Sequence, residues 1–150
     1  MSRIYFPLTG SAENRKAIAK VISFAGSFNM KLTAISVVNN ELLFKMERYK
    51  IFIKEETTII KNGMTKDAEN YLNHVKKLGS EGGVEVTPVL LEGDPYSCIM
   101  DYIKHDKEDN KIVCVAKKCG GEFLKDIFSA VERKILLNTT FDTFVIGENV

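Results

Sequence analysis

Short apolar runs alternate along this chain with longer stretches of helical periodicity. Each apolar run has the length of a strand and is bounded by turn-forming or charged residues. We therefore predict five strands, over residues 4–8, 32–38, 84–91, 112–116 and 144–146. Between them, apolar side chains recur at three- and four-residue spacing, which predicts helices over about residues 11–28, 64–78, 95–103 and 122–137.

Residues typical of helix ends lie beside these stretches. Ser11 is a candidate N-cap for the first helix, and Asn29 lies where that helix should stop, because asparagine tolerates left-handed backbone. Gly79 is predicted to close the second helix. Asp94 followed by Pro95 predicts the N-cap and first residue of the third.

Residues 39–60 have no clear period but are rich in apolar side chains. We expect this segment to be partly helical and to pack against another part of the structure. Packing on the same domain, a lid over a cleft and a partner surface are the three alternatives. The apolar residues concerned are Leu42, Leu43, Phe44, Met46, Tyr49, Ile51, Phe52 and Ile53.

Strands that alternate with helices predict an α/β fold: one domain over residues 1–150, with a five-stranded parallel sheet and helices on both faces, doubly wound and Rossmann-like. Pro88 cannot donate to a ladder, so its strand should lie at an edge. The apolar strand 112–116 should be central. Ligands of such sheets bind beyond the carboxyl ends of the strands, which here would collect residues 9–11, Val37 and 116–121.

Composition narrows the possible partners and the compartment. The chain has 150 residues, with 21 basic and 20 acidic side chains and a net charge of +1, which gives no reason to expect nucleic acid or an anionic membrane as partner. We find no signal peptide and no apolar run long enough to span a bilayer. Cys98, Cys114 and Cys119 are odd in number and lack C-x-x-C spacing, so reduced thiols in the cytoplasm are expected.

Four segments resemble the universal stress protein family in order and spacing. They are the opening strand 4–11, the run 90–95 ending in Gly-Asp-Pro, the helix 129–136 and the closing strand 143–146. The resemblance covers nearly the whole chain. It implies an adenine-nucleotide-hydrolase-like fold, a role in stress response, and a homodimer joined through Thr143, Phe144, Val145 and Ile146.

The ATP-binding members of that family carry a glycine, two residues, a second glycine, nine residues, and then glycine followed by serine or threonine. The glycines let backbone N–H groups approach phosphate oxygens. Here the corresponding residues are Ala116, Cys119 and Ser129-Ala130, so the motif is degenerate, although Gly120 and Gly121 lie beside the second position. Where the family has an acidic residue after the first strand, this chain has Thr9. Carried over residue by residue, the nucleotide site would comprise Pro7, Thr9, Val37, Val115, Ala116, Cys119, Gly120, Gly121, Ser129, Ala130 and Val131.

The sequence offers no catalytic motif: neither G-x-S-x-G nor a Walker A sequence is present, and His74 and His105 lack metal-ligand spacing. Cys119 is either a reactive thiol or a small residue in a glycine position. The leading hypothesis is a non-enzymatic, cytoplasmic regulatory protein of the stress response. It would act as a homodimer, with an unidentified protein partner and weak or no ATP binding. The alternative is an ATP- or AMP-binding protein with Mg²⁺ and slow hydrolysis.

Overall fold

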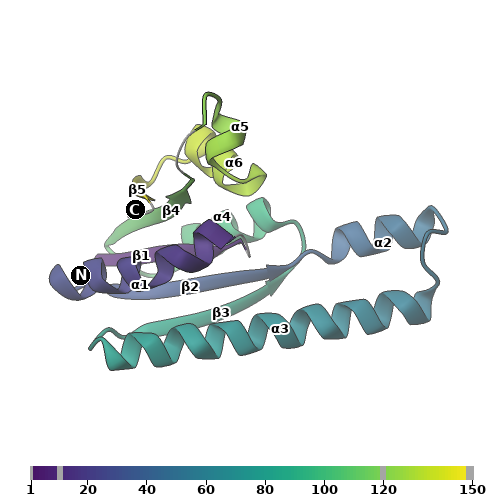
Figure 1. Ribbon diagram of the computed structural model, residues 1–150, viewed down its shortest axis with the longest axis horizontal. Coiled ribbons are helices and arrows are strands. Elements are labelled where there is room, and N and C mark those ends of the chain that lie inside the picture. Colours follow the sequence, from purple (N-terminus) through teal and green to yellow (C-terminus); the bar gives the residue numbers. More distant parts are fainter. Residues whose placement is uncertain (1, 10–11, 119–120, 148–150) are drawn as a thin grey trace.

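The computed structural model describes residues 2–9, 12–118 and 121–147 (Figure 1). The elements are β1 (Ser2–Leu8), α1 (Ala12–Ser27), β2 (Lys31–Val38), α2 (Asn40–Arg48), α3 (Lys54–Glu81), β3 (Val86–Glu92), α4 (Pro95–His105), β4 (Asn110–Lys117), α5 (Leu124–Ile127), α6 (Ala130–Asn138) and β5 (Asp142–Gly147). The strands form one sheet in the order β3-β2-β1-β4-β5, and every pair is parallel. The predicted five-stranded parallel α/β sheet is confirmed.

Two apolar layers sandwich the sheet, because alternate side chains of each strand point to opposite faces. On one face, Ile4 and Phe6 of β1 pack with the buried stripes of α1 and α3. On the other, Tyr5 packs with Ile99 and Ile103 of α4 and with Ile135 of α6. Helices therefore cover both faces, as the alternation of strands and helices predicted.

The positions of the outer strands agree with the sequence patterns. Pro88 lies on β3, which pairs with β2 at one edge of the described sheet. The apolar strand β4 lies inside the sheet, between β1 and β5. Both predictions are confirmed. Strand β5 forms the other edge, which becomes relevant to self-association below.

Helix α1 ends as its sequence predicts. Asn29 adopts φ 53°, and its N–H donates to the Gly26 carbonyl at 3.3 Å, while the Met30 N–H donates to the Ala25 carbonyl at 2.8 Å. This pair of hydrogen bonds is the Schellman motif. The predicted N-cap Ser11 lies outside the described residues.

Helix α4 begins at the predicted cap. Asp94 accepts the Ser97 N–H at 3.0 Å, and Pro95 follows as the first helical residue. The hydrogen bond from the Ser97 N–H lowers the pKa of Asp94, because it stabilises the charged carboxylate.

Replacing Asp94 with alanine should lower the free energy of unfolding by about 1 kcal/mol at neutral pH, the usual value of an N-cap. The pKa of Asp94 is lower in the folded than in the unfolded chain. Its contribution is therefore complete above the unfolded pKa of about 3.9 and is lost as pH falls through the folded pKa. Urea denaturation at neutral pH and at roughly pH 3 tests this. Asp101→Ala, at an exposed position of the same helix, is the control. An Asp94→Ala deficit that stays constant across pH would contradict the assignment.

The structure corrects the second predicted helix. Helix α3 begins at Lys54, ten residues before the predicted start at Met64, and continues through Gly79 to Glu81. Gly79 is buried inside the helix beside the sheet, where a Cβ would meet the side chain of Val86 and lie 3.0 Å from the Val84 carbonyl oxygen. This glycine allows close helix–strand packing, and the helix is capped instead by Gly82.

The helix predicted over residues 122–137 is in fact two helices. The short α5 and the longer α6 are separated by Phe128 and Ser129. Ser129 caps α6 by accepting the Glu132 N–H at 3.3 Å. A serine that competes for backbone hydrogen bonds favours a helix start at this position over a continuous helix.

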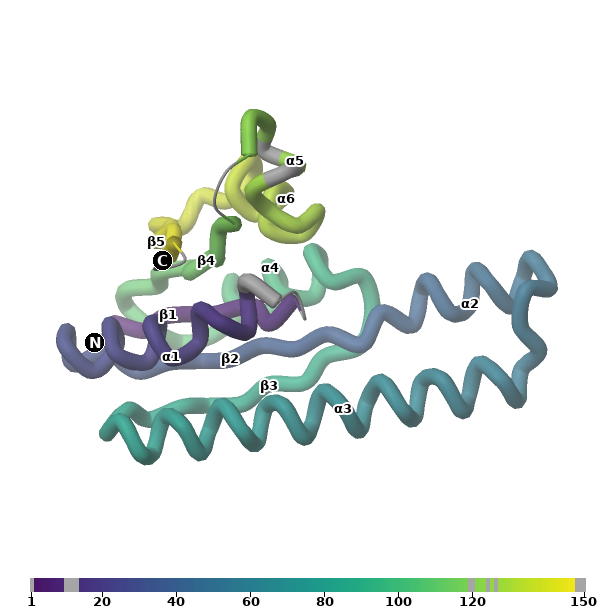
Figure 2. Tube along the Cα trace, viewed as in Figure 1, coloured from purple at the N-terminus to yellow at the C-terminus, as the bar shows by residue number. Residues whose placement is uncertain are grey.

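The segment over residues 39–60 forms a helical arm instead of packing onto the domain. Helix α2 and the first half of α3 lie against each other and project beyond the sheet, as the trace in Figure 2 shows. Leu43 and Thr57 are buried, whereas most other apolar side chains here are exposed. The arm is tied to the sheet through Glu92, which pairs with Lys61 at 3.1 Å and accepts a hydrogen bond from Asn40 at 3.3 Å. None of the described helices is both long and apolar enough to cross a membrane.

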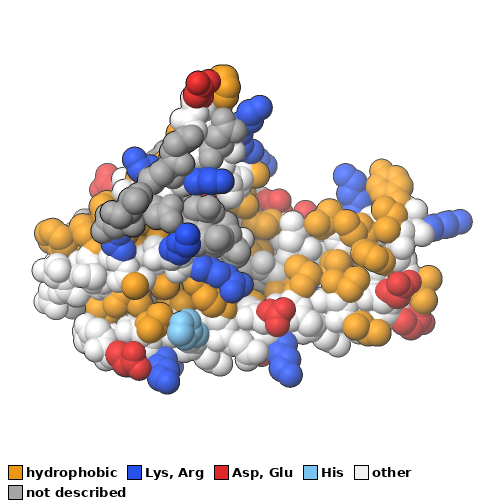
Figure 3. All heavy atoms as spheres, in the orientation of Figure 1, with side chains coloured by type: hydrophobic (Ala, Val, Ile, Leu, Met, Phe, Trp, Pro, Cys, Tyr) orange, Lys and Arg blue, Asp and Glu red, His pale blue; other side chains and the backbone are white. Residues whose placement is uncertain are grey.

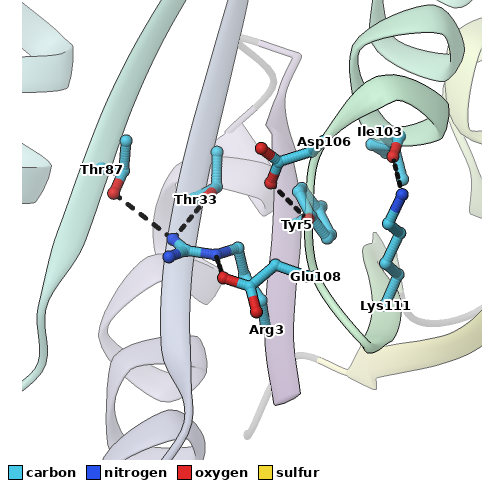
Figure 4. Close-up of polar contacts among 8 residues, drawn as sticks. All are labelled: Arg3, Tyr5, Thr33, Thr87, Ile103, Asp106, Glu108 and Lys111. Atoms are coloured by element: carbon cyan, nitrogen blue, oxygen red, sulfur yellow. Dashed lines mark hydrogen bonds and ion pairs between the residues drawn. The ribbon is translucent and has the colours of Figure 1, made fainter. Parts of the chain in front are cut away.

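A polar network lies near the amino ends of the strands (Figure 4). The Arg3 Nε donates to Glu108 at 2.8 Å, and its Nη1 donates to the hydroxyls of Thr33 at 2.9 Å and Thr87 at 3.3 Å. Because Arg3 is only 9% exposed, these acceptors satisfy a guanidinium that would otherwise be costly to bury. The network joins β1, β2 and β3 to the loop before β4.

Candidate functional site

The sheet opens at the point where its strand order reverses. Pairing between β1 and β4 stops at Tyr5 and Val113, although β1 continues along β2 to Leu8 and β4 continues along β5 to Lys117. The carboxyl halves of β1 and β4 therefore leave backbone groups for other partners. Such a switch point is where doubly wound sheets bind ligands.

Pro7 and Asn14 hold this opening in place. Pro7 has no N–H, and its carbonyl accepts a hydrogen bond from the Asn14 Nδ2 at 2.9 Å. The Asn14 Oδ1 accepts the Thr9 N–H at 3.1 Å. Asn14 is fully buried, so a side-chain amide here fixes the turn between β1 and α1. The sequence analysis did not single out Asn14, because one asparagine in a helical stretch gives no periodic signal.

A pocket of about 290 Å³ lies beside this opening. It is formed by the carboxyl ends of β1 and β2 together with the first turns of α4 and α6. Most of its lining is apolar, and two side-chain hydroxyls are the polar groups. The described lining residues are Leu8, Thr9, Val37, Pro95, Ile99, Ser129, Ala130 and Val131.

The fold brings together five of the residues carried over from the family motif. Thr9, Val37, Ser129, Ala130 and Val131 all line the pocket, although they come from three separate parts of the chain. They make the pocket the candidate site, whatever ligand it takes.

Four other residues assigned to the site from the family motif do not line the pocket. Pro7, Val115 and Ala116 are buried within strands β1 and β4. Gly121 is half-buried. Cys119 and Gly120 lie outside the described residues, so the structure says nothing of them.

Glu132, which the sequence analysis did not assign to the site, occupies the opening. Its Oε2 accepts the Ala116 N–H at 3.0 Å, and its Oε1 accepts the Ser129 N–H at 3.2 Å. Glu132 is only 3% exposed. Ala116 and Ser129 stand at the first and third glycine positions of the phosphate-binding motif. The carboxylate thus takes two of the N–H groups that the motif would present to a phosphate.

The sequence carries a signal for one of the two hydrogen bonds of Glu132, the one with Ser129. Ser129-x-x-Glu132 before an apolar run is a capping box, in which the two side chains satisfy each other's backbone N–H groups. The bond to Ala116 has no such signal, because it joins α6 to β4. A negative charge at a helix N-terminus is also favoured by the helix dipole.

The described cysteines are poor nucleophiles. Burial, reinforced by the charge of Glu132, raises the pKa of the Cys114 thiol to about 12. Burial also raises the pKa of Cys98, whose Sγ donates to the Glu92 carbonyl at 3.3 Å. Nucleophilic chemistry needs a thiolate, so neither residue is suited to it near neutral pH.

Strand β5, predicted as the dimer interface, turns two of its side chains inward. Ile146 is buried, and the Phe144 ring stacks on Phe24 of α1 at 4.2 Å between ring centres. Val145 is 39% exposed, and Thr143 is half-buried. What β5 can offer a partner is therefore its backbone edge together with Val145.

Solved structures with this fold include universal stress proteins. The hypothetical protein MJ0577 aligns with a TM-score of 0.76 and 19% identity over 98% of this chain and 96% of its own. Universal stress protein UspA from Lactobacillus plantarum aligns at 0.75 and 14% over 97% of each chain. A universal stress protein in complex with cAMP aligns at 0.60 and 13% over 97% and 95%. No protein-family model and no curated protein sequence matches the chain. The chain therefore has the fold of the universal stress proteins, and at identities this low the alignments establish the fold alone.

Proposed function

We propose that this chain is a regulatory protein of the universal stress protein type that acts in the cytoplasm without catalysis and does not depend on ATP. The fold, its full-length alignment with universal stress proteins and the four sequence segments support the family. The carboxylate of Glu132, which occupies the phosphate-binding N–H groups, supports the absence of ATP binding.

Glu132 is the observation that carries the proposal. A phosphate at this place would need the N–H groups of Ala116 and Ser129, and both already donate to the carboxylate. Two like charges about 4 Å apart repel by about 4 kcal/mol at an effective dielectric constant of about 20. That repulsion alone would weaken binding of a phosphate group about a thousandfold.

The lining of the pocket argues against an enzyme. Its eight described residues include no histidine, cysteine, lysine or carboxylate that could act as general acid, general base or nucleophile. The hydroxyls of Thr9 and Ser129 would orient a small uncharged ligand among apolar side chains. Regulation would then follow from ligand or partner binding.

The second candidate function is binding of an adenine nucleotide, ATP or AMP, with Mg²⁺ and slow hydrolysis. The pocket's place at the switch point favours it, as does the solved universal stress protein in complex with cAMP. It requires Glu132 to leave its two N–H partners when the nucleotide enters.

Titration calorimetry with ATP and Mg²⁺ separates the two functions. We expect no binding up to millimolar nucleotide by the unaltered protein. Glu132→Gln keeps the size of the side chain but removes its charge, and should gain at least tenfold in affinity for ATP. Glu122→Gln, at an exposed position before α5, is the matched control and should change nothing. Submillimolar binding by the unaltered protein would reject the proposal and leave the nucleotide function.

We further propose that the protein is a homodimer joined through β5. Strand β5 lies at an edge of the described sheet, and an edge strand favours pairing with a second copy. Light scattering should give twice the chain mass at micromolar concentration. Val145→Lys should reduce it to that of one chain, whereas a monomeric unaltered protein would refute this part of the proposal.

A further inference from the structure

The arm presents a set of large apolar side chains to solvent. Leu43 of α2 and Thr57 of α3 are buried where the two helices meet. Six larger apolar side chains of the arm are 49–71% exposed, namely Leu42, Phe44, Tyr49, Ile51, Ile53 and Ile59. Apolar helix surface is normally covered by another element, so these side chains indicate a contact that a single chain does not make.

Charged side chains of both signs surround these apolar residues. Residues 45–50 include Lys45, Glu47, Arg48 and Lys50, and residues 54–56 are Lys54, Glu55 and Glu56. Glu47 and Lys54 line the same groove between α2 and α3, so their opposite charges offset each other. The remaining charge is basic at the end of α2 and acidic at the start of α3, as the two helix dipoles favour.

This separation of charge is visible at the outer end of the arm. The space-filling view shows basic side chains beside α2, acidic ones beside the start of α3 and hydrophobic ones among them (Figure 3). A surface of one sign would attract one helix end and repel the other. The matching partner therefore carries both signs, in the same arrangement but with the two helices exchanged.

A second copy of this chain meets that requirement. In a two-fold contact the same surface meets itself, so each residue pair occurs twice with the roles reversed. When two arms lie face to face with their outer ends together, α2 of each copy lies along α3 of the other. The basic end of α2 then meets the acidic start of α3 twice, and the exposed apolar side chains lie between the arms.

The exposed apolar area sets the strength of such a contact. Each of the six side chains exposes roughly 100 Å², so covering most of them on both copies buries about 1,000 Å², the lower bound for a specific interface. An interface of this size is weak, and we expect a dissociation constant of about 100 µM.

We propose that the arm is a self-association surface, through which two copies of this chain pack their arms as a four-helix unit. The contact is separate from the pocket and from the β5 edge. It is too weak to add to a β5 dimer at micromolar concentration. At higher concentration, a chain with both two-fold contacts would assemble beyond the dimer.

Sedimentation equilibrium of the full chain carrying Val145→Lys tests the arm without the proposed β5 contact. We expect the mass of one chain at about 5 µM and a rise toward two chains at about 500 µM. Adding Arg48→Glu should weaken association at least about tenfold, because like charges then meet at both contacts. Adding Glu55→Lys instead should do the same for the same reason.

Mixing these two charge variants separates a contact between arms from damage to the arm. In an equimolar mixture each altered side chain faces its altered partner, so association should return to the level of the Val145→Lys protein. Ile51→Ser combined with Ile59→Ser should abolish association. Lys77→Glu makes the same charge change at an exposed position outside the arm and should change nothing.

The same series in the chain that keeps Val145 provides a second measurement. There, association through the arm should appear at high concentration as mass above that of the dimer, and the charge variants should remove it. Three results would overturn the proposal: one chain mass at about 500 µM for the Val145→Lys protein, no recovery in the mixture, or equal weakening by Lys77→Glu.

Discussion

Replacing Glu132 with alanine is expected to lower the free energy of unfolding by about 3 kcal/mol. The N–H groups of Ala116 and Ser129 would lose their common acceptor in a buried place, and each unsatisfied group costs about 1–3 kcal/mol. Glu132→Gln should lose less, because its amide retains one acceptor oxygen. Urea denaturation of the three proteins measures the difference.

A control variant shows whether the loss of stability comes from the buried hydrogen bonds of Glu132. Glu122→Ala removes an exposed carboxylate and should stay within about 0.5 kcal/mol of the unaltered protein. If Glu132→Ala were as stable as that control, the carboxylate would not be holding β4 and α6 together. The physical basis of the proposed ATP independence would then be lost as well.

The second large effect concerns two glycines of helix α3. Alanine normally stabilises a helix interior relative to glycine by about 1 kcal/mol. At Gly63 a Cβ would meet nothing within 4 Å, so Gly63→Ala should raise the free energy of unfolding by about that amount. At Gly79 a Cβ would collide with Val86, so Gly79→Ala should lower it by about 2 kcal/mol despite the better helix propensity.

Thermal or urea denaturation of both variants tests the contrast in sign. The double variant Gly79→Ala with Val86→Ala removes the closest of these contacts, that with the Val86 γ-methyl, so the two changes should cost less than the sum of their separate effects. A stabilising Gly79→Ala would show that helix and strand are not in close contact there.

Gly79 also shows why the bounds of α3 could not be predicted. A glycine after an apolar stripe is typical of a helix end, but it equally allows a helix to lie close against a strand. Only the position of Val86 distinguishes the two, and that contact belongs to the tertiary structure. The strands were predictable, because apolar runs buried on both faces are self-evident in the sequence.

The sequence predicted where the candidate site lies, but not all of the residues that shape it. Strand alternation implied the switch point, and the family motif supplied Thr9, Val37 and Ser129, which the fold brings together. The roles of Asn14 and Glu132 required the structure. Each is a single polar residue whose partners lie on another element, so no spacing in the sequence reveals them.

The sequence predicted that the arm is partly helical, but its exposure could not be predicted, for a related reason. Many apolar residues over 39–60 implied burial, because apolar surface is usually removed from water. A two-helix projection can bury only its inner side chains, such as Leu43, and leaves the rest exposed. Apolar content shows that surface is available, and only the topology shows whether this chain covers it.

Helix α3 also sets a distance. It runs without a break from Lys54 at the far end of the arm to Leu72, its first residue in the core beside the sheet, a span of about 27 Å at about 1.5 Å per residue. The helix therefore acts as a stiff spacer. The length of this one helix therefore fixes how far the end of the arm stands from the residues that pack on the sheet.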